Sequence, residues 1–485
     1  MGGQPAEPLD QLAACLLEEH VWEKFPAIVV LRHQDLNQIS LHPSPPTAPE
    51  HTPDGVQAER AYGSAAPGRS AGGCSNVSVR MRLLIVAALA ATIGFPAAAV
   101  AQDTRAELLE RLRAEKASQL KPYEAGRLER WVMRAEDGRL RRLITPHNGF
   151  FVSLGYTHKP VGAGIGFGGG FRHDLFDRRA RIELGAGSSF RNYQMVRADF
   201  SLPRLFDERL ELGVEALYRR HPQEDFYGPG PDSSEADRVS YLFKGRELQG
   251  RAIVAVAPWL RVGTLVGHLA PSIGAGTDAR FPTLEAGFDQ RAAPGIFEQP
   301  SYAYGEAFAD VDYRDEPGNA RAGGRYRVGL RKYGDRDLDR YGFRSLDLLF
   351  QQFVPLFDKK RVFAFQAALV GTSAGEGHQV PFYMQPTVGG SRTLRSVADY
   401  RFRDTHAMWL NAEYRWEVFS ALDMALFTDW GQVAPGGSEL SLSNLTPAYG
   451  IGFRFNTAQA VFFRVDVATG GGEGLQLFVK FNRAF

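Results

Sequence analysis

The pentapeptide GTSAG, Gly371 to Gly375, has the G-x-S-x-G spacing of a nucleophile elbow, in which a serine hydroxyl attacks an acyl carbon. An elbow needs a strand before the serine and a helix directly after it, but the residues that follow, EGHQVPFY, do not predict a helix. We therefore expect Ser373 to be a chance match, and His378 and His406 to be polar groups without a part in acid–base chemistry. The chain is not expected to be an enzyme, and a hydrolase using Ser373 stays a remote alternative.

Charge and cysteine content exclude other kinds of chemistry. The 485 residues carry 56 Lys and Arg against 55 Asp and Glu, so there is no strong electric field to attract nucleic acid. Both cysteines, Cys15 and Cys74, lie in the first eighty residues, which leaves no disulfide, zinc cluster or thiol nucleophile after them. We expect no nucleic-acid partner, no metal and no cofactor.

The last hundred positions contain several arginines and acids that could pair with each other. Arg395 lies in the segment QPTVGGSRTLRSVADYRFRD, shortly after Gly389 and Gly390, and Glu413 and Asp429 follow in NAEYRW and TDWG. The forked guanidinium of an arginine can bind a carboxylate through two parallel hydrogen bonds. Whether the three groups meet depends on the elements that carry them.

The first 147 residues predict export rather than a folded domain. Residues 81–101 have a basic start, an apolar run and the small-residue exit AVA, which is typical of a cleaved signal peptide; a membrane anchor would need about 20 apolar residues. Residues 1–80, rich in Pro, Gly and Ser, are expected to be a mis-assigned upstream extension or a disordered tail. Residues 102–147 predict a short helical linker in the periplasm, too small to bury a core of its own.

Residues 148–485 alternate apolar and polar side chains with the period of a β-strand. In LELGVEALYRR, for example, Leu210, Leu212 and Val214 share one face, and Glu211 and Glu215 share the other. About sixteen such segments begin near residues 148, 162, 178, 191, 209, 239, 259, 303, 323, 343, 361, 406, 422, 447, 460 and 474.

The links between these segments differ in length at the two ends of the sheet. Links after even-numbered strands are short, whereas three links after odd-numbered strands, at about 221–238, 271–302 and 375–404, are long. Short turns at one end and long loops at the other are typical of a transmembrane β-barrel. We therefore predict an all-β fold, an antiparallel barrel of about sixteen strands. Its last strand ends with the aromatic residues Phe481 and Phe485, which we interpret as an assembly signal.

In such a barrel the polar faces of the strands that begin near 406 and 422 place Glu413 and Asp429 in the lumen. The segment around Arg395 resembles the sixth external loop of BamA/TamA-type outer-membrane proteins, the bacterial surface antigen superfamily. Residues 226–241 are similar to the third external loop of the same family. The resemblance implies that Gly389 and Gly390 form a turn and that Arg395 latches the long loop inside the barrel. The family's glycine and aromatic residue after the arginine are Ser396 and Val397 here.

The resemblance also implies a location and a function. It places the barrel in the bacterial outer membrane, in contact with outer-membrane lipids, with the barrel assembly machinery acting on it during biogenesis. A short member without the periplasmic POTRA modules is expected, because 102–147 is shorter than one module. Assistance to the insertion or translocation of proteins or lipids is the implied function, with an unfolded outer-membrane protein or a lipid as client. A diffusion channel with a charged lumen is the alternative.

We predict that deleting Phe485 lowers the yield of assembled barrel, because the terminal aromatic residue is the expected recognition element for assembly. The measurement is the fraction of protein in the outer-membrane fraction that migrates faster on gels before boiling than after it. An unchanged fraction would show that assembly does not depend on Phe485.

Overall fold

The computed structural model describes residues 148–154, 166–456 and 461–481, together with the isolated positions Glu110, Arg111, Glu115 and Arg130. Apart from those four positions, the predicted extension, signal peptide and linker lie outside the described residues, and so does Phe485. Within the described ranges, no helix has the length and apolar character needed to cross a bilayer.

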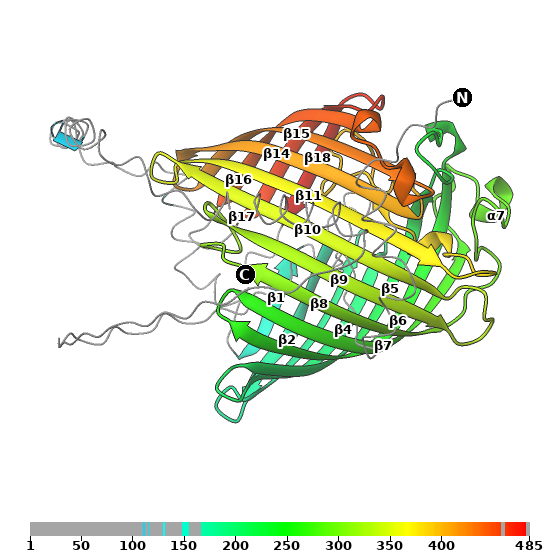
Figure 1. Ribbon diagram of the computed structural model, residues 1–485, viewed down its shortest axis with the longest axis horizontal. Coiled ribbons are helices and arrows are strands. Elements are labelled where there is room, and N and C mark those ends of the chain that lie inside the picture. The colour runs from blue at the N-terminus through cyan, green and yellow to red at the C-terminus, as the bar shows by residue number, and fades with distance from the viewer. Residues whose placement is uncertain are drawn as a thin grey trace, which may run out of the picture. The chain divides into compact units, whose positions relative to one another are not determined.

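Sixteen strands form one antiparallel sheet in which each strand pairs with the next one along the chain, and the sheet curls into a barrel (Figure 1). The strands are β1 (Gly149–Leu154), β2 (Gly166–Leu175), β3 (Ala180–Ser189), β4 (Gln194–Leu205), β5 (Leu210–Phe226), β6 (Val239–Ala257), β7 (Leu260–Ala275), β8 (Tyr302–Asp312), β9 (Gly323–Asp335), β10 (Phe343–Leu356), β11 (Arg361–Ala374), β14 (His406–Phe419), β15 (Leu422–Ala434), β16 (Thr446–Asn456), β17 (Val461–Gly470) and β18 (Gln476–Phe481). Each begins within four residues of its predicted start. The predicted sixteen-stranded barrel is confirmed.

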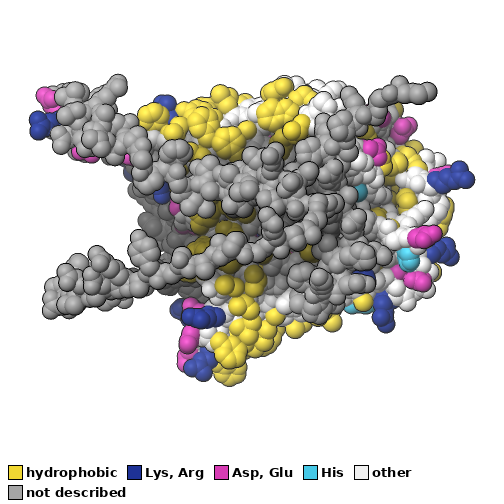
Figure 2. All heavy atoms as spheres, in the orientation of Figure 1, with side chains coloured by type: hydrophobic (Ala, Val, Ile, Leu, Met, Phe, Trp, Pro, Cys, Tyr) yellow, Lys and Arg dark blue, Asp and Glu magenta, His cyan; other side chains and the backbone are white. Residues whose placement is uncertain are grey.

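The two faces of the sheet have inverted polarity compared with a soluble protein. On β5, Val214 is 49% exposed whereas its neighbour Glu215 is 7% exposed, and on β4 the same holds for Phe200 and Asp199. Large apolar side chains therefore cover the outside of the barrel, where Figure 2 shows them gathered, and charged side chains lie inside. This is the arrangement of a barrel whose outer surface contacts lipid.

The long links lie at one end of the barrel, at 227–238, 276–301 and 375–405. The first two are shorter than predicted, because β5 and β7 continue through Pro222 and Pro271. Pro222 falls in an irregular stretch of pairing between His221 and Glu224. Proline cannot donate a ladder hydrogen bond, so it marks a strand end in sequence even where the strand continues past it.

At the other end, the short-link end, the connection between β8 and β9 departs from the predicted pattern. It spans residues 313–322 and folds into the barrel mouth. There Ala320 packs in one apolar cluster with Phe353, Val362 and Ala364. The sequence does not indicate this inward fold, because the segment has no periodicity of its own.

One ion pair fixes this connection to the far side of the mouth. Arg321 donates hydrogen bonds of 2.8 and 2.7 Å to the carboxylate of Asp423 on β15, and one of 2.9 Å to the carbonyl of Lys359. The amide of Val461, the first residue of β17, donates to the carbonyl of Gly318 at 3.2 Å. The β8–β9 connection thus joins the middle of the sheet to its C-terminal strands.

We predict that Arg321→Ala lowers barrel stability by about 1–3 kcal/mol, because the buried carboxylate of Asp423 loses the cation that binds it. The measurement is the temperature at which the fast-migrating folded form disappears on gels.

The matched control is Arg280→Ala, which breaks an ion pair with Asp278 whose arginine is 67% exposed. Such a pair contributes about 0–1 kcal/mol. Equal shifts for the two variants would show that the inward fold of the β8–β9 connection does not depend on Arg321.

Candidate functional site

The link between β11 and β14, residues 375–405, folds into the lumen. It contains a short 3₁₀ helix, η4 (Phe382–Met384), and a two-stranded sheet of β12 (Thr387–Val388) and β13 (Phe402–Arg403). Val388, Leu394 and Val397 are fully buried in one apolar cluster with residues of the barrel wall, among them Trp409 and Val433. Apolar packing thus positions the loop, because these side chains leave water on entering the lumen.

Two glycines shape the tip of this loop. Gly389 and Gly390 have φ values of 134° and 81°, which residues with a side chain rarely adopt. The amide of Gly390 donates to the carbonyl of Val397 at 3.1 Å, and the amide of Gly389 donates to the hydroxyl of Thr393 at 2.8 Å. The chain therefore reverses between Gly389 and Val397 and carries Arg395 on the reversed segment.

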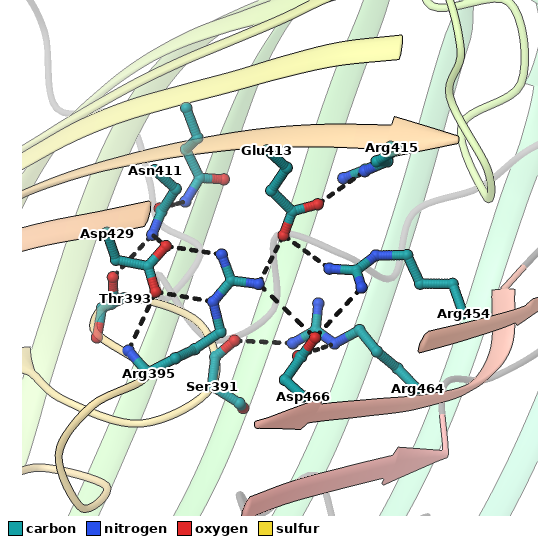
Figure 3. A network of polar contacts seen from close by, with 11 residues as sticks. Ser391, Thr393, Arg395, Asn411, Glu413, Arg415, Asp429, Arg454, Arg464 and Asp466 are labelled. Carbon is teal, nitrogen blue, oxygen red and sulfur yellow. Dashed lines mark hydrogen bonds and ion pairs between the residues drawn. The ribbon is translucent and has the colours of Figure 1, made fainter. Parts of the chain in front are cut away.

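The guanidinium of Arg395 lies between two carboxylates of the barrel wall (Figure 3). Its Nε and Nη2 donate to Asp429 on β15 at 2.7 and 2.6 Å, and its Nη1 donates to Glu413 on β14 at 2.6 Å. The backbone amide of Arg395 also donates to Asp429, at 3.2 Å. The structure thus brings the three residues of the predicted ion cluster together, with Arg395 3% exposed and Asp429 fully buried.

An aromatic ring completes the surroundings of Arg395. The guanidinium carbon lies 3.4 Å from the ring centroid of Phe427, a distance at which a cation–π interaction is favourable. Burial disfavours the charged form of Arg395, but Asp429 and Glu413 outweigh that effect, so the pKa of Arg395 is raised above its ordinary value. The side chain therefore stays a cation and cannot act as a proton donor or acceptor.

A second layer of ionic groups surrounds the first and was missed at the sequence level. Arg454 on β16 donates to Glu413 at 2.7 Å and to Asp466 on β17 at 3.2 Å. Four guanidinium groups face three carboxylates in this cluster, namely those of Arg395, Arg415, Arg454 and Arg464 against Glu413, Asp429 and Asp466. The signal in the sequence was that Arg454 and Asp466 share the inner face with Glu413, but the distances across strands cannot be obtained from that face alone.

A further arginine, Arg401, ties the loop to two other links. It binds the carboxylate of Glu473, in the link between β17 and β18, and the hydroxyl of Ser233, in the link between β5 and β6, the latter at 2.9 Å. The amide of Gly230 donates to the carbonyl of Arg403 at 2.9 Å, which adds a backbone contact to the same β5–β6 link. These contacts join three links into one body at the long-link end.

The other candidate residues do not gather into a catalytic site. Ser373 lies within β11, directly across from Arg344, so no elbow forms there. His378 accepts a hydrogen bond from the amide of Gly342 at 3.3 Å, and His406 begins β14 beside Thr405. Among the described residues, no group of three or more potential metal ligands lies together.

The two residues that follow Arg395 pack at the loop tip. Ser396 and Val397 are both fully buried, and the Ser396 hydroxyl donates to the carbonyl of Pro447 at 3.4 Å. Small side chains are suited to this position, since the tip fits closely against the barrel wall. Phe481 is the last residue of β18, and its part in assembly, like that of Phe485, stays a prediction.

Fold and site together define a transmembrane β-barrel in which the link between β11 and β14 lies in the lumen and its buried Arg395 binds two carboxylates of the wall. Among solved structures, it is similar to BamA from Haemophilus ducreyi lacking POTRA domains 1–3, with a TM-score of 0.51 and 14% identity over 68% of this chain and 69% of that chain. The predicted BamA-like barrel fold is therefore confirmed.

Two other solved structures match with lower scores. CdiB from Acinetobacter baumannii has a TM-score of 0.44 and 12% identity over 69% of this chain and 56% of its own, and CdiB from Escherichia coli has 0.46 and 10% over 68% and 61%. No protein-family model and no curated protein sequence matches the chain.

We predict that Arg395→Ala releases the loop while the barrel still forms, because the strands pair independently of it. Breaking a buried ion pair costs about 3–5 kcal/mol, and water in the lumen reduces that figure. The measurement is protease cleavage within 376–404 in the folded protein. Arg395→Lys should restore protection only in part, since an ammonium cannot make the forked contact.

A double-mutant cycle tests the pairing itself. If Arg395→Ala, Glu413→Ala and the double variant change loop protection additively, the two residues do not interact. A strongly non-additive result is expected, because each single variant leaves the same contact broken.

Proposed function

We propose that this protein resides in the bacterial outer membrane and assists the insertion or translocation of proteins or lipids there. The observation that carries the proposal is that the long loop lies inside the lumen, where its Arg395 binds Asp429 and Glu413 of the wall. A loop fixed in this way occupies the route that a wide diffusion pore would need. The groups that fill the lumen then stabilise the strands of the barrel wall. The client contacts these strands and does not pass through the lumen.

The location is supported by the inverted polarity of the barrel. Its outside carries exposed apolar residues such as Val214 and Phe200, and its inside carries paired charges. In water that outer surface would be a large apolar patch, which soluble monomers avoid. In a bilayer it is satisfied by outer-membrane lipids.

The two ends of the sheet support an action on clients. Among the described residues no pairing joins β1 to β18, so these two strands form the edges of the sheet. An edge strand offers unpaired amide and carbonyl groups, to which an incoming strand can add. An unfolded outer-membrane protein fits this edge as a client, and so does a lipid that enters the bilayer beside it. The barrel assembly machinery is the expected partner during the protein's own biogenesis.

A diffusion channel is the second candidate, since a charged lumen suits the passage of polar solutes. Two features of the lumen argue against a wide channel. Arg325 binds Asp310 at 2.8 Å, and Arg327 binds Glu306 at 2.9 Å, so many lumenal charges are already paired with each other. The loop and the β8–β9 connection both enter the lumen and reduce the open cross-section. Planar-bilayer conductance separates the two functions, because a wide pore passes a large and steady current.

We predict that the purified protein in liposomes accelerates the folding of a test outer-membrane barrel and passes little current in a planar bilayer. Arg395→Ala should lower the acceleration and raise the conductance, since a released loop neither supports the wall nor fills the lumen. A large conductance together with no effect on folding would favour the channel. Lipolysis by the wild type that is abolished in Ser373→Ala would revive the hydrolase.

A further inference from the structure

Three links at the short-link end share the tripeptide LFD, followed by two charged residues. They read LFDRR at 175–179, LFDER at 205–209 and LFDKK at 356–360, and they connect β2 to β3, β4 to β5 and β10 to β11. In each, the leucine ends a strand and the phenylalanine begins the turn. Nothing in the long-loop site uses these residues.

The three links also share an unfavourable backbone conformation. Phe176, Asp177 and Arg178 have φ values of 50°, 54° and 67°. The values are 51°, 56° and 66° at 206–208, and 50°, 56° and 64° at 357–359. Left-handed conformations are disfavoured for every residue that carries a Cβ, and short hairpin turns ordinarily use asparagine and glycine there. Repeated strain at the same residue types points to a function of the side chains.

The strained turn exposes its phenylalanine. Phe176, Phe206 and Phe357 are 76%, 78% and 64% exposed, although a phenyl ring gains free energy by leaving water. The ring of Phe357 lies 5.1 Å from the guanidinium of Arg361. Arg361 shares its face of β11 with the exposed residues Phe363 and Phe365, so this ring lies toward the outside of the barrel rather than its lumen.

Strand length sets the level of these rings relative to a bilayer. β2 and β3 have ten residues each, and at about 3.3 Å per residue and a tilt of about 45° they rise roughly 23 Å. That is close to the height of about 25 Å of the apolar band of an outer-membrane barrel. This places the β2–β3 turn with Phe176 at the lipid headgroups; the strands beside the other two turns are longer, at 12 and 17 residues for β4 and β5 and 14 each for β10 and β11.

We propose that Phe176, Phe206 and Phe357 are membrane anchors that insert into the headgroup region of the leaflet at the short-link end. The aspartate and the basic residue that follow each phenylalanine stay in the adjoining water. The β2–β3 and β10–β11 turns are eight strands apart in a sheet of sixteen, so anchors lie on opposite walls of the barrel. Anchors so placed fix both the depth and the tilt of the barrel. The inference rests on the proposed membrane location.

The test uses single cysteines in the full chain. Both natural cysteines, Cys15 and Cys74, are replaced by serine, and a cysteine is introduced at Phe176, Phe206 or Phe357 and labelled with an environment-sensitive fluorophore. The protein is reconstituted in vesicles of phosphatidylethanolamine and phosphatidylglycerol. Quenching is measured with acrylamide in the water, with nitroxides on the headgroups and with nitroxides deep in the acyl chains.

Two control positions calibrate the measurement. Val214→Cys, on the outward face of β5, should be quenched by the deep nitroxides. Asp339→Cys, an exposed residue with a φ of 53° in the link between β9 and β10, should be quenched by acrylamide. The three phenylalanine positions should show several-fold less acrylamide quenching than Asp339, and strongest quenching by headgroup nitroxides.

The outcomes separate the two proposals. If Val214 responds to acrylamide and not to lipid nitroxides, the proposed membrane location fails. If the label at Val214 is quenched by lipid nitroxides while the labels in the three turns are quenched by acrylamide, as at Asp339, the proposed anchoring is wrong. The proposed membrane location is then still supported. Protection of the turns from all three quenchers would also overturn the anchors, because it would mean contact with protein.

A second measurement does not depend on a label. The triple variant Phe176→Ser, Phe206→Ser and Phe357→Ser should lose heat resistance in vesicles but keep that of the wild type in detergent micelles. An equal loss in both would show that the phenyl rings stabilise the turns themselves, and would contradict anchoring.

Discussion

Each strand of this barrel must satisfy two solvents at once, and the rest of the structure depends on that constraint. In hydrocarbon no water is present to pair with the backbone, so every amide and carbonyl needs a partner in the protein. The sheet meets this need by pairing each of its sixteen strands with its sequence neighbour. Alternate side chains then face lipid and lumen, which explains why apolar residues are exposed and charged residues are buried.

The polar lumen creates a second requirement, because charges removed from bulk water must be paired. On one wall Arg251 binds Asp199 and Glu211 at 2.6 and 2.7 Å. On the C-terminal wall Asp429 is bound by a cation from the long loop instead, and Glu413 is bound by the same cation together with Arg415 and Arg454 of the wall. The loop is therefore part of the charge balance of the wall, and the wall in turn determines where the loop lies. That mutual dependence is what makes Arg395 a structural centre rather than a catalytic one.

Much of the fold could be predicted from sequence because its signal is local. Alternation at period two identifies a strand from its own residues, and the same alternation showed that Glu413 and Asp429 face inward. The inward fold of the β8–β9 connection could not be found, since Arg321 and Asp423 are 102 positions apart and the segment between its strands has no pattern. The contacts of Arg454 and Asp466 with Glu413 and Arg395 could not be predicted either, because they depend on the stagger of neighbouring strands. The ends of β5 and β7 were predicted too early, because each strand contains a proline that cannot donate a ladder hydrogen bond. Pairing with the neighbouring strand β6 nevertheless continues each strand past that proline.

The contacts of the C-terminal wall come from both ends of the barrel. β17 is held at its first residue by the β8–β9 connection, through Val461, and further along by the long loop, whose Ser391 carbonyl accepts a hydrogen bond of 2.8 Å from Arg464. β15 is held in the same two ways, through Asp423 and Asp429. The wall is thus fixed from both mouths up to β17, and β18 follows it with a ladder of six paired residues. The contacts of β15 and β17 with the long loop and with the β8–β9 connection therefore hold this part of the wall at both ends of its strands.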